Sequence, residues 1–153
     1  MATTRTTHIR TTRTTDDDPR YRRTEVVRTN ADRAVRPAYQ ILMFAFISLP
    51  VVAGIDKFYD RLVDWSEYLA PQVGGHLPVT SQQFMHGAGI VEILAGLLVA
   101  LKPSVGALVV ALWLWGIVAN LLVSGAHYDI ALRDFGLSLG ALALSRLATA
   151  FHR

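Results

Sequence analysis

Long apolar runs, separated by short polar stretches, dominate the chain after residue 37. There are four of them, at residues 38–55, 84–101, 105–124 and 130–150. Each is close to the ~20 residues that an α-helix needs to cross the hydrocarbon core of a bilayer. Because the runs are continuous rather than alternating, they do not fit the strands of a membrane barrel. The pattern predicts an all-α membrane protein with a bundle of four transmembrane helices.

The long connection after the first run has a different pattern. Between residues 57 and 70, apolar side chains recur at helical spacing from Phe58 to Leu69, with charged residues between them. This spacing predicts a short amphipathic helix on the outer surface of the membrane. Trp65 and Tyr68 would then lie at the level of the lipid headgroups.

Residues 1–36 form a polar segment rich in Thr and Arg, interrupted by three consecutive Asp residues. This segment has too few apolar residues to offset the entropy lost on ordering. We therefore predict a disordered cytoplasmic tail over residues 1–36, followed by a four-helix transmembrane domain over residues 37–153.

Composition and charge support this division. The chain is 52% hydrophobic and only 18% charged, with a net charge of +3. Most Arg residues precede the first apolar run, as orientation signals of membrane proteins do. We therefore expect both termini to be cytoplasmic and the lipid bilayer to be the main surrounding, and we do not expect a nucleic-acid partner. The absence of Cys excludes disulfides, iron–sulfur clusters and thiolate metal sites.

Glu92 is the clearest polar residue inside an apolar run. An ionisable side chain at that depth is costly and marks a candidate functional site. Gly89 and Gly96 lie on the same helical face and are predicted packing residues, because small residues let two helices approach closely.

The fourth run offers a matching face. Arg133 shares it with Gly136 and Gly140, and Asp129 lies one turn before Arg133, where the two can pair. We expect Arg133 to point inward, toward Glu92 or the Asn120 side chain of the third run. Asp129, Gly136 and Gly140 are then structural, as clamp or packing residues.

The polar residues of the four runs fall at a common depth near the outer side. Two interpretations stay open: a structural clamp that holds the helices in register, and a pocket for a ligand headgroup. The candidate pocket residues are Glu92, Asn120, Arg133, Asp134, His86 and Trp113.

His86 and His127 are both expected on the outer side. Two His residues from facing helices could ligate a haem, but no sequence spacing pairs them, so a haem is not favoured. No phosphate-binding loop, zinc motif or nucleophile–base pair is found in the sequence, and no metal site or catalytic residue is predicted.

Three stretches together resemble the DoxX family of small four-helix bacterial membrane proteins: GIDKF at the end of the first run, GIVEILAGLLVAL in the second and YDIALRDFGLSLGALAL entering the fourth. The resemblance covers residues 38–150. It implies a multi-pass protein of the bacterial cytoplasmic (inner) membrane and a link to oxidoreductase systems that pass electrons to quinone. By this resemblance Glu92, Asn120, Arg133 and Asp134 become candidate quinone-pocket residues.

Two functional hypotheses follow, and the sequence does not decide whether the protein is an enzyme. The first is a DoxX-like, redox-linked membrane subunit that interacts with quinone and relies on a partner subunit for its chemistry. The alternative is a non-catalytic accessory or assembly subunit of a larger membrane complex. A small transporter fits less well, because the polar residues gather in one leaflet instead of following a path across the membrane.

Overall fold

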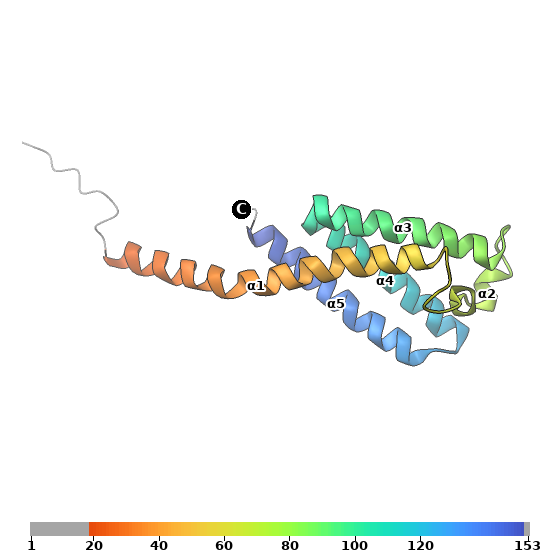
Figure 1. The fold of residues 1–153 in the computed structure, drawn as a ribbon. Coiled ribbons are helices and arrows are strands. Elements are labelled where there is room, and N and C mark those ends of the chain that lie inside the picture. The colour runs from red at the N-terminus through yellow and green to blue at the C-terminus, as the bar shows by residue number, and fades with distance from the viewer. Residues whose placement is uncertain (1–18, 152–153) are drawn as a thin grey trace, which may run out of the picture. The chain divides into compact units, whose positions relative to one another are not determined.

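The computed structural model describes residues 19–151, and all regular secondary structure within this range is helical (Figure 1). The elements are α1 (Pro19–Asp56), the 3₁₀ helix η2 (Trp65–Tyr68), α2 (Pro71–Gly74), α3 (Ser81–Leu101), α4 (Pro103–Ser124) and α5 (Tyr128–Phe151). The chain divides into two compact units, one ending at Pro37 and the other beginning at Ala38. The first 37 residues are called the arm and the second unit the bundle.

The described part of the arm is helical. Since α1 begins at Pro19, the prediction of a disordered tail is wrong for residues 19–36, whereas residues 1–18 lie outside the described range. The prediction considered only the apolar area available for packing. Arg, Ala and Glu favour helix, and a helix that has already formed extends at little further cost. The apolar part of α1 supplies that helix, and Pro suits its first position.

Helices occur at all four predicted apolar runs. Three segments are long and apolar enough to cross a membrane, namely Arg33–Asp56, Ser81–Leu101 and Pro103–Ser124. The fourth run forms α5, which has 24 residues. Many large apolar side chains of the bundle are exposed on its outside, for example Phe44, Leu94, Leu112 and Leu132. A soluble protein rarely exposes so much apolar surface, so these helices belong to a membrane-type protein.

Local signals set the ends of the central helices. Thr80 caps α3 by accepting a hydrogen bond from the Gln83 N–H, and the Gln83 side chain accepts one from the Thr80 N–H. Lys102 alone separates α3 from α4, because Pro103 cannot continue α3 but suits the start of α4. Gly125, with φ of 72°, ends α4 in the left-handed conformation.

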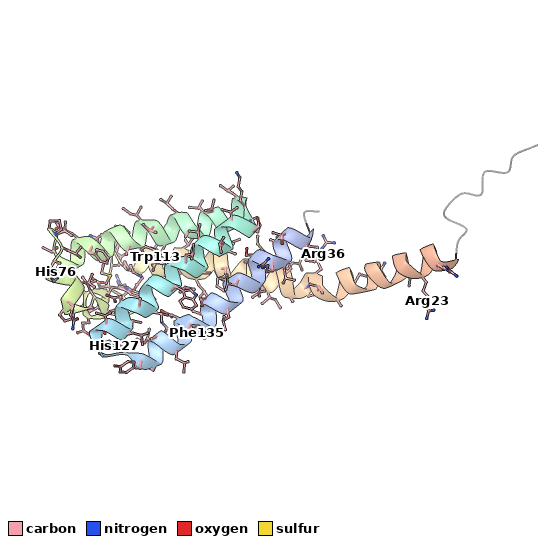
Figure 2. The ribbon with its side chains drawn as sticks, turned by 180° about the vertical axis from the view of Figure 1, so that it is seen from behind. Arg23, Arg36, His76, Trp113, His127 and Phe135 are labelled. Atoms are coloured by element: carbon pink, nitrogen blue, oxygen red, sulfur yellow. The ribbon has the colours of Figure 1, made fainter. Side chains whose placement is uncertain are left out.

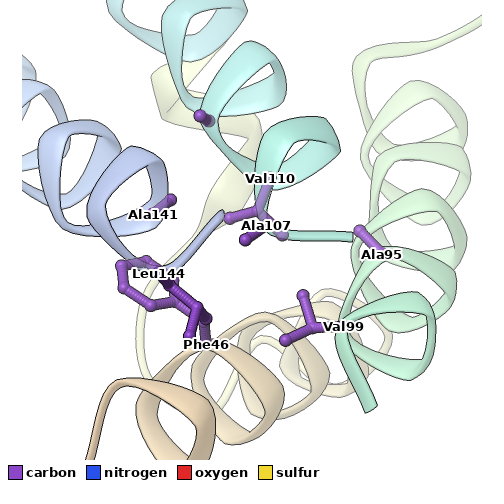
Figure 3. Close-up of a cluster of buried hydrophobic side chains, with 8 residues drawn as sticks. Phe46, Ala95, Val99, Ala107, Val110, Ala141 and Leu144 are labelled. Atoms are coloured by element: carbon purple, nitrogen blue, oxygen red, sulfur yellow. The ribbon is translucent and has the colours of Figure 1, made fainter. Parts of the chain in front are cut away.

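Small residues bring the helices of the bundle together. A Cβ atom on Gly54 of α1 would lie 2.5 Å from the Gly89 carbonyl oxygen of α3, and one on Gly89 would lie 2.6 Å from the Gly54 carbonyl oxygen. Gly96 faces Val51 of α1 in the same way. Gly89 and Gly96, predicted as packing residues, therefore pack on α1 rather than on α5. The core beside them contains Phe46, Ala95, Val99, Ala107, Val110, Ala111, Ala141 and Leu144 (Figure 3).

Residues 57–80 close one end of the bundle, together with the turn from Gly125 to His127. We call this the loop end, and we call the opposite end, which holds Lys102, the turn end. The predicted amphipathic helix over residues 57–70 is wrong, since only η2 and the short α2 form in this segment. The reason is the Asp56 carboxylate, which accepts hydrogen bonds from the Arg61 and Leu62 N–H groups and turns the chain back.

Candidate functional site

A buried ion pair joins the loop-end terminus of α1 to a residue near the middle of α3. Lys57 follows the last residue of α1, and its Nζ atom lies 2.7 Å from Oε2 of Glu92. The two side chains are only 6% and 8% exposed. The close contact between Gly54 and Gly89 places the two backbones near enough for this pairing. The expectation that Arg133 points toward Glu92 or Asn120 is wrong for Glu92, whose partner is Lys57.

Two Trp residues complete the surroundings of the pair. Trp113 of α4 donates a hydrogen bond from Nε1 to Oε1 of Glu92 at 3.2 Å. The ammonium of Lys57 lies 3.5 Å from the centre of the Trp65 ring, in cation–π contact. Both carboxylate oxygens of Glu92 are therefore bound by donors of the protein itself. We call Lys57, Glu92, Trp65 and Trp113 the clamp.

Asp56 ties the loop to the clamp. Its Oδ2 accepts a hydrogen bond from Nε1 of Trp65 at 2.8 Å, and its carboxylate also receives the N–H groups of Arg61 and Leu62. Trp65, predicted at headgroup level, instead lies half-buried between Asp56 and Lys57. The sequence pattern indicated the apolar character of Trp65 correctly. It did not indicate that the Trp65 N–H donates a hydrogen bond to the Asp56 carboxylate inside the protein.

Asn120 of α4 holds the far part of the same loop. Its Nδ2 donates to the Tyr68 carbonyl at 2.7 Å, and its Oδ1 accepts from the Ala70 N–H at 3.0 Å. A side-chain amide thus pairs with a backbone segment as a neighbouring strand would. Asn120 lies near the loop end as predicted. Its side chain binds the backbone of the loop and not Arg133, which is bound to Asp134.

The expected face of α5 is also wrong. Arg133 points outward with a side chain 65% exposed, and its Nε lies 3.1 Å from Oδ1 of the adjacent Asp134, whose side chain is 8% exposed. Its ion pair is with Asp134 rather than the exposed Asp129. Gly136 is open, and only Gly140 packs inward, on the Phe46 ring of α1.

The actual buried face of α5 lies on another side of the helix. The expected buried face was the one that carries Arg133, Gly136 and Gly140. The face that packs against the bundle is instead formed by a longer series of residues at three- and four-residue intervals. That series was readable from the sequence as four small residues together with one Asp and one Leu. Its members are Ala131, Asp134, Ser138, Ala141, Leu144 and Ala148.

Two of the His residues near the loop end, His86 and His127, each have a buried ring nitrogen without a hydrogen-bond partner. These atoms are Nε2 of His86 and Nδ1 of His127. The His86 ring stacks on Phe58 at 4.9 Å, and the His127 ring lies 4.8 Å from that of Tyr68. His127 belongs to the turn between α4 and α5 (Figure 2). Unpaired buried polar atoms are uncommon and need an explanation.

Lys57, Trp65 and Asp56 were absent from the candidate residues, although the structure places them at the centre of the site. The available signal was the position of Asp56 and Lys57 directly after an apolar run, where a Lys can reach back to a carboxylate in a neighbouring helix. Among residues 19–151, no group of three or more His, Asp or Glu side chains could hold a metal ion.

The fold and the clamp define a helical bundle of membrane type, held at its loop end by a buried ion pair. Comparisons of the chain with protein-family models, with curated proteins and with solved structures returned no match.

Proposed function

We propose that this protein is a multi-pass membrane subunit without a catalytic centre of its own, acting as an accessory or assembly component of a larger membrane complex. One observation carries the proposal. Glu92, the charge placed midway along α3, has both oxygens bound by Lys57 and Trp113, and the Lys57 ammonium is covered by the Trp65 ring. A group so fully paired is suited to fixing helices in register, not to exchanging a proton or receiving a ligand.

In this proposal α5 crosses the bilayer as a fourth span. Its 24 residues would extend roughly 36 Å, which is long enough for the hydrocarbon core. Charges favour a cytoplasmic turn end: the bundle carries Lys102 and Arg146 there without a nearby acidic residue, whereas the acidic residues lie toward the loop end. Both termini would then be cytoplasmic, in the inner membrane of a bacterium.

The arm is the element we assign to a protein partner. Residues 19–37 contain six Arg residues against one Glu and one Asp. They form a helix in a unit separate from the bundle. A basic helix of this kind suits an acidic surface on a cytoplasmic or membrane subunit.

The experiment is purification of the tagged full-length chain from native membranes in a mild detergent, with quantitative mass spectrometry of the copurifying proteins. We expect one or more partners in fixed stoichiometry, with reduced recovery after combined Arg23→Gln, Arg33→Gln and Arg36→Gln substitution. The matched control is Arg61→Gln with Arg146→Gln, outside the arm. Recovery of the wild-type chain without any stoichiometric partner contradicts the proposal.

A second candidate is the redox-linked, quinone-interacting subunit of the DoxX resemblance. The observation that favours it is the pair of unpartnered nitrogens, Nε2 of His86 and Nδ1 of His127, since a ring N–H can donate to a quinone carbonyl. Extraction of bound quinone from wild type and from His86→Phe and His127→Phe variants tests it. Retained quinone that both substitutions remove supports this function over the first. Equal quinone content in all three proteins rejects it.

A further inference from the structure

Arg133 is a cation on the outside of α5, beside exposed apolar side chains and the exposed carboxylate of Asp129. The exposed apolar side chains of α5 include Leu132 and Leu139, which are 73% and 50% exposed. Arg133 is five residues into the helix, roughly 7–8 Å from its start. With α5 in the bilayer, as proposed above, this side chain faces lipid close to the headgroup level rather than bulk water.

Asp134 fixes the direction of the Arg133 guanidinium. The buried Asp134 carboxylate binds Nε, which is on one edge of the guanidinium plane. Within residues 19–151, Arg133 makes no other hydrogen bond or ion pair. Its two Nη groups therefore form an outward-facing fork, and such a fork matches two oxygens of a phosphate.

Asp129 adds a second charge to the same flank. It is exposed and lies four residues before Arg133, so the two side chains are neighbours separated by about one helical turn. Among the described residues, Asp129 forms no ion pair. It is nearer the start of the helix than Arg133, hence farther from the hydrocarbon core. A headgroup with its phosphate nearer the hydrocarbon core and its ammonium farther out would match this order, since the phosphate would meet Arg133 and the ammonium would meet Asp129.

We infer that Arg133 and Asp129 form a site for the headgroup of an aminophospholipid such as phosphatidylethanolamine. The Arg133 fork binds the phosphate, and Asp129 accepts a hydrogen bond from the primary ammonium. Phosphatidylcholine has the same charges but no N–H to donate, and phosphatidylglycerol has no cation. The site thus selects by hydrogen bonding as well as by charge.

The inference rests on the proposed placement of α5 in the bilayer, and the test separates the two. The full-length protein is reconstituted with equal amounts of phosphatidylethanolamine, phosphatidylcholine and phosphatidylglycerol, and retained lipids are counted by native mass spectrometry. We expect phosphatidylethanolamine to be retained about fivefold over phosphatidylcholine, the effect of roughly one net hydrogen bond, because the two headgroups carry the same charges and differ in the N–H donor.

Two variants separate the roles of the two residues. Asp129→Ala, which leaves no acceptor oxygen, removes the preference but keeps lipid binding, whereas Arg133→Gln removes retention of all three lipids. Arg61→Gln with Asp64→Asn, in the exposed loop, serves as the matched control and leaves the preference intact. An unchanged ratio in Asp129→Ala overturns the inference. Displacement of all lipid by inorganic phosphate also overturns it, since the site would then take phosphate from any source.

A separate measurement reports on the placement of α5. The chain has no natural Cys, so Leu139→Cys provides a single thiol. Protection of this thiol from a membrane-impermeant reagent supports the bilayer placement, and modification rejects both that placement and the lipid site. Loss of the lipid preference with a protected thiol rejects the lipid site alone.

Discussion

The Nζ atom of Lys57 lies 2.7 Å from Oε2 of Glu92, and both side chains are almost entirely buried. The pair connects residues that are 35 positions apart in the chain. It fixes where α1 ends relative to α3, and through Trp65 and Trp113 it also reaches the loop and α4. The ion pair and its two Trp contacts therefore connect four segments of the chain.

Removing one partner of the ion pair should destabilise the bundle strongly. Lys57→Met or Glu92→Leu leaves an uncompensated buried charge, which typically costs about 3–5 kcal/mol. The double variant should recover most of that loss, because both charges are then absent. A double-mutant cycle on the free energy of unfolding in mixed micelles measures this. Additive losses in the double variant would show that the two residues do not act as a pair.

The Trp113 hydrogen bond should be separable from the packing of its ring. Trp113→Phe keeps an aromatic ring but removes the donor to Glu92 Oε1. Loss of a hydrogen bond to a charged group costs about 1.5–3 kcal/mol. Trp115→Phe, at a half-exposed ring in edge contact with Phe135, is the control and should cost less. The free energy of unfolding of the two variants provides the comparison. Equal losses would argue against the hydrogen bond.

A side chain at position 54 should destabilise the bundle, whereas a side chain at position 136 should be tolerated. The Cβ of Gly54→Ala would meet the Gly89 carbonyl oxygen, so α1 and α3 must separate, at about 1–3 kcal/mol for overpacking. A Cβ on Gly136 has no atom within 4 Å. Gly136→Ala should therefore be neutral or stabilise by about 0.5–1 kcal/mol through helix propensity. Thermal unfolding of both variants decides; a destabilised Gly136→Ala would show that a further molecule covers that surface.

Asn120 should control the opening of the loop. Asn120→Leu keeps the size of the side chain but leaves the buried Ala70 N–H and the Tyr68 carbonyl without partners. We expect faster hydrogen exchange at Ala70, with an opening free energy lower by about 1–3 kcal/mol. Ser124→Ala, which removes only bonds to nearby backbone atoms of its own turn, should leave this exchange rate unchanged. Unaltered exchange at Ala70 in Asn120→Leu would contradict the role of the amide.

The sequence was most reliable for segments whose side chains share one property. Continuous apolar runs produced helices α3, α4 and α5 at the expected places, because a backbone in an apolar surrounding must satisfy its hydrogen bonds within the helix. It was least reliable where a few contacts compete. The segment after Asp56 has helical periodicity, yet the Asp56 carboxylate binds its N–H groups and prevents a continuous helix.

In the candidate site, too, some residues could be recognised from the sequence and others could not. Glu92 and Trp113 were recognisable because a charge in an apolar run and a Trp at matching depth are unusual in themselves. Their partner was not recognisable. Arg133 and Lys57 are both cations near the same end of a span, and nothing in the linear pattern states which of them faces inward.

The sequence by itself determined that the chain forms apolar helices of membrane length, with basic residues concentrated before the first of them. These properties depend on composition and on neighbours along the chain. The tertiary structure alone decided that Lys57 meets Glu92 and that Arg133 turns outward to Asp134. The physical reason is the close approach of α1 and α3 at Gly54 and Gly89, which rotates Glu92 toward the end of α1. Helix rotation of this kind depends on packing between segments that are distant in sequence.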